Sequence, residues 1–175
     1  MTDMCILKRF YPDERKDSAY NIDYEKLSDA GIKGLIFDID NTLVPHGWPA
    51  DKRAIELFER IHGCGMATAL VSNNKEPRVK PFAQAVDSYY IFKADKPMKK
   101  GYQRAMEMMN TTAQTTVFIG DQLFTDVYGA KRCGIHSILT EPINPKEEIQ
   151  IVLKRYLEKI VLYFYAKEIR KQNKR

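Results

Sequence analysis

Two aspartates that lie two residues apart are the first residues whose types and spacing could do chemistry. Asp38 and Asp40 follow the apolar run at residues 35–37 and are separated by Ile39. If strand geometry continues through them, Ile39 points to the opposite side and both carboxylates face one crevice. Crowding two like charges costs free energy unless a cation or a shared proton relieves it. The pair therefore indicates a site that holds a cation or a proton.

Further polar residues follow two other apolar runs of the chain. Ser72 and Asn73 come directly after residues 66–71. Asp121 follows a third run, and Asp126 comes shortly after it. Ligands of open parallel sheets bind beyond the carboxyl ends of the strands, so we expect these groups at one edge. A few carboxylates suit Mg²⁺, and the sequence has no His or Cys cluster that would favour zinc or copper.

Each of these residues also has an ordinary structural role when it is considered alone. A strand-end aspartate such as Asp38 commonly caps a helix or closes a turn, and Ser72 fits a helix N-cap. Lys96 alone fits a surface charge. His46 and Trp48 follow the first pair closely but are better explained as loop residues. Only the joint placement of the polar groups favours an active site.

The elements that would position these residues alternate along the chain. Apolar runs and helical periodicity predict strands at 33–37, 66–71, 89–92, 115–119 and 135–139, and helices at 51–62, 77–85, 99–110 and 125–133. Strands that alternate with helices indicate parallel βαβ units, hence an α/β three-layer sandwich around a central parallel sheet. A short helix is predicted at 23–30 within an otherwise irregular N-terminal segment, and one long helix at 145–171.

Composition sets the broad class of the protein. The chain has 175 residues, of which 44% are hydrophobic and 29% charged, as expected for one globular domain. Cys5, Cys64 and Cys133 are far apart, which argues against a disulfide framework and suits a reducing cytosol. The first residues do not resemble a secretory signal. The longest apolar run, residues 160–166, is far short of the about 20 residues that a membrane-spanning helix needs.

The excess positive charge lies at the C-terminal end. Residues 146–175 hold nine Lys or Arg and four Asp or Glu, a net charge of +5 that equals that of the whole chain. A basic tail favours an anionic partner such as lipid or nucleic acid. Solvated charge on a terminal helix is the alternative interpretation.

Four segments together resemble the motifs of the haloacid dehalogenase-like (HAD) superfamily. The run from Asp38 to Val44 resembles the first motif, and Ser72 resembles the second. Lys96 resembles the third, and residues 120–126 resemble the fourth. The motifs occur in the order that the superfamily requires and each follows a predicted strand. The resemblance implies a Rossmann-like HAD fold and a phosphomonoester hydrolase that requires Mg²⁺.

The resemblance also implies a role for each catalytic residue. Asp38 would be the nucleophile that forms an aspartyl-phosphate. Asp40 would protonate the leaving alcohol and then activate water, and an aspartate at its position implies a phosphatase or phosphotransferase. Ser72 would donate a hydrogen bond to a phosphoryl oxygen. Lys96 would pair with Asp38 and the phosphate, which offsets negative charge in the transition state.

The same resemblance implies the residues that bind metal and substrate. Asp38, Asp121 and the backbone carbonyl of Asp40 would surround Mg²⁺. Asp126 would either support the metal from outside or orient Lys96. The substrate-binding set would be Ser72, Asn73 and Lys96.

The spacing between motifs leaves no room for a cap domain. The intervals 40–72 and 72–96 are each filled by one predicted helix and one strand, so we expect a site that is open to solvent. The segments 31–44, 71–74, 94–97 and 120–126 are most similar to the YqeG-like branch of capless members, which is related to phosphatidylglycerophosphate phosphatases. This similarity implies phosphatidylglycerophosphate as the leading substrate. A soluble sugar phosphate or nucleotide is an alternative, as is a non-catalytic module that binds RNA or ribosomes.

These expectations divide the chain into three parts. Residues 1–30 form an N-terminal extension packed on the core, 31–144 the HAD-like catalytic domain, and 145–175 a basic amphipathic helix and tail. The helix has a broad apolar face with basic residues beside it, which fits packing on the domain, a homodimer contact, or peripheral contact with an anionic membrane. The tail has few alternations of arginine and aromatic residues, which disfavours nucleic acid. We expect a cytoplasmic protein, and peripheral binding to the inner face of the membrane is one form of this expectation.

Overall fold

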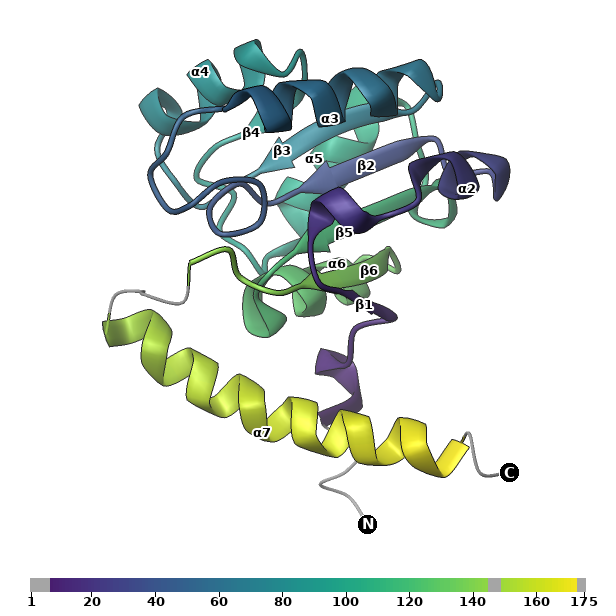
Figure 1. The fold of residues 1–175 in the computed structure, drawn as a ribbon, viewed down its shortest axis with the longest axis vertical. Coiled ribbons are helices and arrows are strands. Elements are labelled where there is room, and N and C mark those ends of the chain that lie inside the picture. Colours follow the sequence, from purple (N-terminus) through teal and green to yellow (C-terminus); the bar gives the residue numbers. More distant parts are fainter. Residues whose placement is uncertain (1–6, 145–148, 173–175) are drawn as a thin grey trace.

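The computed structural model describes residues 7–144 and 149–172, and its centre is a parallel sheet (Figure 1). The sheet has six strands in the order β1-β6-β5-β2-β3-β4. The strands are β1 (Glu14–Lys16), β2 (Gly34–Phe37), β3 (Ala67–Val71), β4 (Tyr89–Ile91), β5 (Thr116–Gly120) and β6 (His136–Thr140). The α-helices are α2 (Tyr24–Asp29), α3 (Lys52–Gly63), α4 (Glu76–Ala85), α5 (Lys99–Met109), α6 (Tyr128–Arg132) and α7 (Ile149–Gln172).

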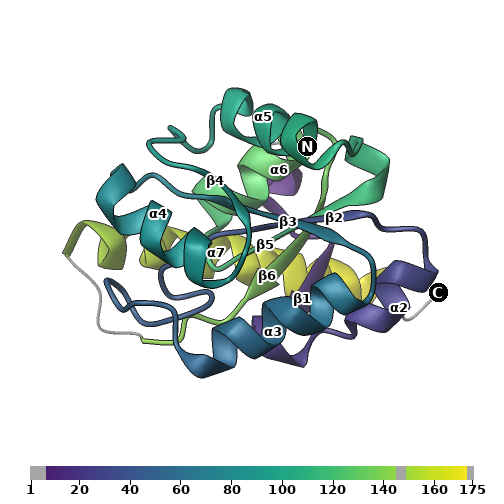
Figure 2. The ribbon, with the colours of Figure 1, turned by 90° about the horizontal axis from the view of Figure 1, so that it is seen from above.

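The two central strands are fully buried because helices cover both faces of the sheet (Figure 2). The core on one face includes Phe37 of β2 and Phe58 of α3, together with residues of α2 and α4. The core on the other face includes Ile36 of β2 and Tyr102 of α5, together with a residue of α6. Neighbouring residues of β2 therefore enter opposite cores, which explains the continuous apolar run in this strand.

The chain changes direction across the sheet at β2. From β2 it proceeds outward to β3 and β4, and then it returns to β5 on the other side of β2. Phe37 is in register with Ile119 of β5, and the backbone N–H of Asp38 donates to the Ile119 carbonyl over 3.0 Å. The ends of β2 and β5 thus lie side by side at the topological switch point, where ligands of open α/β sheets bind.

The structure confirms the predicted α/β sandwich, with one added strand and one altered helix. The added strand, β1, pairs with β6 within the segment that the sequence indicated was irregular. Its three residues, Glu14, Arg15 and Lys16, are all charged and give no apolar signal. The Asp13 carboxylate accepts hydrogen bonds from the backbone N–H and the hydroxyl of Ser137, which hold the segment beside β6. The predicted helix at 125–133 is instead a π-helical turn, η4 (Leu123–Val127), that leads into α6.

The interval between the first and third motifs contains no cap. Residues 40–96, which the structure describes throughout, contain α3, β3, α4 and β4 as their only helices and strands. The edge of the sheet where β2, β3 and β5 end is therefore not covered by an inserted domain.

Helix α7 runs along the side of the sheet that carries β1 and β6 (Figure 1). Val161 packs in a cluster with Tyr11, Leu123 and Val127. The buried carboxylate of Glu158 accepts a hydrogen bond of 2.7 Å from the backbone N–H of Leu123. Three predicted features lie outside the described residues, namely the start of this helix at 145, Cys5, and residues 173–175 of the tail. Among the described helices, none is long and apolar enough to cross a bilayer.

Candidate active site

A buried lysine lies between two buried aspartates at the end of the central strands. The Nζ atom of Lys96 is 2.8 Å from Asp38 Oδ1 and 2.8 Å from Asp126 Oδ1. All three side chains are almost completely buried. Lys96 comes from the loop after β4, Asp38 follows β2, and Asp126 belongs to η4. Three segments that are distant in sequence therefore build one charged group.

Burial and mutual charge set the protonation of this group. Burial raises the pKa of Asp38 to about 6, Lys96 opposes that rise, and Asp126 adds to it. Burial by itself would lower the pKa of Lys96, but Asp126 and Asp38 raise it well above its ordinary value. Lys96 is therefore a fixed cation, and it favours the carboxylate form of Asp38, the form that can act as a nucleophile.

A third aspartate completes a cluster that could hold a metal ion. One carboxylate oxygen from each of Asp38, Asp121 and Asp126 lies within 4.8 Å of the others, and all three residues are buried. The hydroxyl of Thr42 donates to Asp121 Oδ1 over 3.0 Å, which fixes that carboxylate. Hard oxygen ligands from carboxylates fit Mg²⁺ better than softer metals. The donor set thus agrees with the predicted metal.

Asp126 reaches the cluster because of the turn that carries it. Its Oδ2 accepts a hydrogen bond of 3.1 Å from the backbone N–H of Gln122, so the side chain folds back toward the end of β5. A Cβ atom at Gly120 would lie 2.5 Å from Asp126 Oδ2, closer than any real contact. Glycine at position 120 is therefore required for the close approach of Asp126 to the strand.

The carboxylate of Asp40 is separate from the metal cluster. The side chain of Ile39 enters the core as expected, but Asp40 Oδ1 accepts from Arg78 Nη2 and from the backbone N–H of Gly47, each over 2.8 Å. Its Oδ2 accepts from Asn74 Nδ2 over 2.6 Å. Among the described residues, the carboxylate is thus held by donors from two loops and a helix.

Ser72 and Asn73 lie at the end of β3 as predicted, and both are engaged in hydrogen bonds. The hydroxyl oxygen of Ser72, a buried residue, accepts from the backbone N–H of Asn74 over 3.2 Å. The Asn73 amide oxygen accepts from the backbone N–H of Lys96 over 2.7 Å, and its Nδ2 donates to the Lys96 carbonyl over 3.4 Å. Asn73 therefore positions Lys96, whereas its predicted contact with substrate stays a prediction.

The sequence interpretation did not single out three residues that contact the predicted site. Arg78 and Asn74 bind Asp40, and Thr42 binds Asp121. Thr42 is part of the first motif and Asn74 follows Ser72 directly, so both could have been inferred from proximity. Arg78 gives no such signal, because a basic residue in the first turn of a predicted helix is usually solvated.

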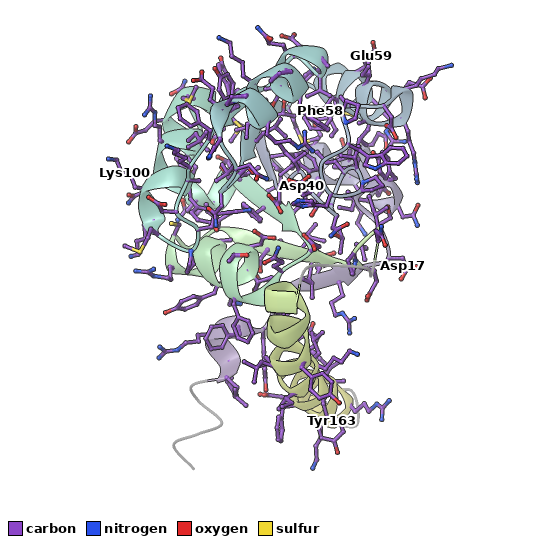
Figure 3. All side chains as sticks on the ribbon, turned by 90° about the vertical axis from the view of Figure 1, so that its left-hand side faces the viewer. Asp17, Asp40, Phe58, Glu59, Lys100 and Tyr163 are labelled. Carbon is purple, nitrogen blue, oxygen red and sulfur yellow. The ribbon has the colours of Figure 1, made fainter. Side chains whose placement is uncertain are left out.

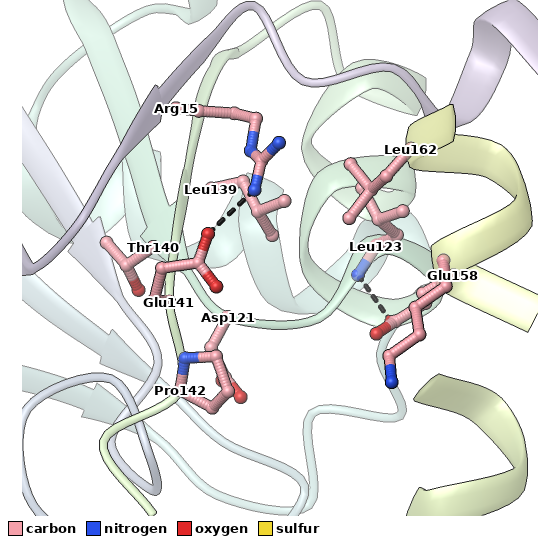
Figure 4. A pocket seen from close by; sticks show the side chains of 10 residues that line it. Arg15, Asp121, Leu123, Leu139, Thr140, Glu141, Pro142, Glu158 and Leu162 are labelled. Carbon is pink, nitrogen blue, oxygen red and sulfur yellow. Dashed lines mark hydrogen bonds and ion pairs between the residues drawn. The ribbon is translucent and has the colours of Figure 1, made fainter. Parts of the chain in front are cut away.

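A cavity of about 140 Å³ adjoins the site on its Asp121 side (Figure 4). It lies between the end of β6 and helix α7, and apolar side chains including Leu123, Leu139 and Leu162 form part of its wall. Lys159 and the ion pair of Arg15 with Glu141, at 2.7 Å, supply polar groups. One residue of the acidic cluster, Asp121, thus borders a cavity on the side on which α7 packs.

Comparison with known proteins gives the family of a chain with this fold and site. The family model of the haloacid dehalogenase-like hydrolases matches residues 46–134, and its match begins after the first pair of aspartates. The chain is 41% identical over 159 residues to a protein of Bacillus subtilis named probable phosphatase YqeG. The match covers 90% of this chain and 92% of that protein. The chain therefore belongs to the haloacid dehalogenase-like hydrolases, as an enzyme of the HAD phosphatase type.

More distant similarities extend over most of the chain. Phosphatidylglycerophosphate phosphatase 1 of Arabidopsis thaliana, a chloroplast and mitochondrial protein, is 29% identical over 164 residues. That match covers 82% of this chain but 47% of the plant protein, so the chain spans about half of its length. Among solved structures, the cobalt-bound deoxy-D-mannose-octulosonate 8-phosphate phosphatase of Haemophilus influenzae has a TM-score of 0.54 at 16% identity, over 81% of this chain and 92% of that one. This structural likeness supports the fold.

Proposed function

We propose that this protein hydrolyses phosphate monoesters with Mg²⁺ and through an aspartyl-phosphate at Asp38. The observation that carries the proposal is the position of Lys96, whose ammonium lies 2.8 Å from Asp38 Oδ1 within a cluster of three buried aspartates. A buried cation beside a buried carboxylate suits the transfer of a phosphoryl group, because it offsets the charge that develops on the phosphate oxygens.

In the first step, a carboxylate oxygen of Asp38 attacks phosphorus and the bond from phosphorus to the alcohol oxygen breaks. Asp40, in its acid form, gives its proton to that leaving oxygen. Lys96 orients Asp38 and neutralises the phosphoryl oxygens, and Ser72 donates a hydrogen bond to one of them. Lys96 is held by the carboxylate of Asp126 and the amide of Asn73.

In the second step, Asp40 acts as the base. Its carboxylate takes a proton from water while the water oxygen attacks the phosphorus of phospho-Asp38. The bond from phosphorus to Asp38 breaks, so phosphate leaves and the free carboxylate returns. One group thus serves as acid and then as base, and the protein ends in its starting state.

Mg²⁺ would be held by Asp38, Asp121 and the backbone carbonyl of Asp40, with Asp126 behind them. Asp126 Oδ1 is bonded to Lys96, which favours an outer position for this residue. When it is bound, the metal supplies positive charge against the dianionic phosphoryl group. The burial of three carboxylates within 4.8 Å of one another supports this assignment, because Lys96 supplies one positive charge against the three carboxylates.

The leading substrate that we propose is phosphatidylglycerophosphate. The basis is the similarity to the plant phosphatase, at 29% identity over 82% of this chain. The absence of a cap from residues 40–96 leaves room for a bulky lipid headgroup. A soluble sugar phosphate or nucleotide remains the alternative substrate, and the buried charged cluster argues against the non-catalytic RNA-binding module.

A phosphate-release screen tests this proposal. With Mg²⁺ present, we expect kcat/KM for a short-chain phosphatidylglycerophosphate to exceed that for sugar phosphates and nucleoside monophosphates by about 10-fold or more. This is the effect of one additional hydrogen bond between the protein and a charged group, here the phosphodiester of the lipid. Removing divalent cations with a chelator should abolish release. A preference for a sugar phosphate would overturn the lipid substrate and keep the phosphatase. No release from any monoester would overturn both.

We further propose that helix α7 contacts an anionic membrane through its outward face. Between 36% and 69% of the surface of five outward residues is exposed, namely Tyr156, Leu157, Ile160, Tyr163 and Phe164. Figure 3 shows Tyr163 on the far side of α7 from the body of the protein. Apolar and aromatic side chains of this kind suit the interface of a bilayer.

The charges of α7 favour a bilayer over a second copy of the chain. Exposed Lys159, Lys167 and Arg170 lie among or beside the apolar residues. The two acids of residues 156–170 are engaged inward, since Glu158 binds Leu123 and Glu168 pairs with Lys8. Two such helices packed together would bring like charges close, whereas anionic lipid complements them.

Vesicle flotation tests the membrane contact. The protein should float with vesicles that contain phosphatidylglycerol and stay unbound with neutral phosphatidylcholine vesicles or at high salt. A double variant, Ile160→Ser with Tyr163→Ser, should lose about 10-fold or more in affinity, since two buried apolar side chains no longer contribute. Met108→Ser, which changes an exposed apolar residue of α5, is the matched control. A stable dimer that the double variant dissociates, without vesicle binding, would assign the face to a second copy.

A further inference from the structure

The guanidinium of Arg78 is the least explained charged group near the site. It comes from the first turn of α4 and its Nη2 donates to Asp40 Oδ1 over 2.8 Å. Its side chain is 19% exposed, so it is close to the surface without being freely solvated. The ring of Phe82 lies 5.5 Å from it and supports it from one side. The group is therefore held in place beside the proposed acid and base.

One donor of this guanidinium is buried and has no partner. Among the described residues, Arg78 Nε makes no hydrogen bond although water does not reach it. An unsatisfied buried donor costs free energy, so native proteins rarely retain one without a reason. Asp40 thus leaves part of this guanidinium unsatisfied, and a shift of the partly exposed side chain toward an anion at the rim would remove the cost.

The surroundings of Asp40 are rich in donors. Besides Arg78, the carboxylate accepts from Asn74 Nδ2 and the Gly47 N–H, and Nδ1 of the half-exposed His46 lies 4.0 Å away. Asp40 is thus bound by two further donors, and it does not need the whole guanidinium. These donors serve the Asp40 carboxylate itself, so the part of the guanidinium that Asp40 does not use is what is left for a second anion.

We infer that Arg78 binds an anionic group on the alcohol part of the substrate, next to the scissile phosphate. This inference rests on the proposed function, since Asp40 there protonates the leaving oxygen and so marks the leaving-group side. A guanidinium is a planar fork of donors that matches the oxygens of a phosphodiester or a carboxylate. The substrate class is therefore a phosphomonoester whose alcohol carries a second oxyanion a few atoms away. Phosphatidylglycerophosphate belongs to this class, and so do phosphorylated hydroxy acids.

The alternative is that Arg78 only positions Asp40. The ratio of kcat/KM for a substrate with a second oxyanion to kcat/KM for one without it separates this alternative from the inference. Glycerol phosphate and phosphoglycerate differ by one carboxylate, and short-chain phosphatidylglycerophosphate adds a phosphodiester instead. The wild type should favour either anionic substrate over glycerol phosphate in kcat/KM. Arg78→Met should reduce that preference about 10- to 100-fold, the effect of losing a hydrogen bond to a charged group, mainly through KM. If Arg78 only positions Asp40, its substitution would lower kcat/KM for all three substrates equally and leave the ratio unchanged.

Controls make the result specific. Lys80→Met, which removes an exposed cation from the same helix, should keep the ratio. Arg78→Lys, which keeps charge but loses the fork, should give an intermediate ratio and guards against misfolding of the methionine variant. A wild-type preference that survives both Arg78 variants would overturn the inference and leave the phosphatase proposal intact. No phosphate release from any of the three substrates would instead overturn the proposed function. The relative response to phosphodiester and carboxylate identifies which oxyanion the site prefers.

Discussion

Asp38→Asn is expected to lower kcat for phosphate release by about 10⁴-fold or more, the scale of losing a nucleophile. The amide has the shape of the carboxylate but its oxygen is a poor nucleophile, so the covalent step cannot start. The effect should be on kcat, because binding groups such as Lys96 and Ser72 are unchanged. Steady-state phosphate release on the best substrate of the screen measures it.

The fold of this variant should survive. Asp38 lies in a crowded acidic cluster, and removing its charge relieves repulsion with Asp126 and Asp121 while Lys96 keeps Asp126 as a partner. Thermal melting without metal should therefore show a midpoint equal to or above that of the wild type. Asp17→Asn, at an exposed position, controls for the loss of an acid elsewhere. Wild-type turnover in Asp38→Asn would show that the nucleophile is wrongly assigned.

Lys96→Met is expected to affect both activity and stability. Methionine has a similar volume but leaves Asp38 and Asp126 without their shared cation, both of them buried. Breaking a buried ion pair on one side typically costs about 3–5 kcal/mol, so the free energy of unfolding in metal-free buffer should fall by about that amount. We expect kcat/KM to fall about 10²- to 10³-fold, as for the loss of one transition-state donor.

Metal should partly restore the stability of this variant. Mg²⁺ would supply positive charge to the same carboxylates, so urea unfolding should shift to higher urea on adding Mg²⁺, more for Lys96→Met than for the wild type. Lys100→Met, at an exposed position of α5, should leave activity and stability unchanged. If Lys96→Met unfolds at the wild-type urea concentration without metal, the ion-pair account of this cluster is wrong.

Local signals predicted most of the elements and of the charged cluster. Apolar runs predicted β2, β3 and β5, because strands that are buried on both faces are continuously apolar and do not alternate with polar residues. Asp38 and Asp121 could be inferred because each follows such a run, and the ends of parallel strands meet at one edge. Lys96 could be inferred only from its resemblance to the third HAD motif, because it lies in the loop after β4. The structure brings these residues together, whereas their chemical roles stay predictions.

Long-range pairing accounts for what local patterns could not predict. Strand β1 is three charged residues that become a strand only through β6 and the bonds of Asp13 to Ser137. The contact of Arg78 with Asp40 joins α4 to the loop after β2, and nothing near either residue in sequence indicates it. The bonds of Asn73 to Lys96 likewise depend on neighbouring strand ends.

The most direct test of the central claim is to trap the phosphoryl group on the protein. An acid quench during turnover with Mg²⁺, followed by peptide mass spectrometry, should find a phosphate on Asp38. The account predicts that this label requires Mg²⁺, is removed by hydroxylamine as an acyl phosphate is, and is absent from Asp38→Asn. Phosphate on a residue other than Asp38 during turnover would contradict the account. So would turnover with no phosphorylated residue, both in the wild type and in a variant of Asp40 in which the second step is slowed.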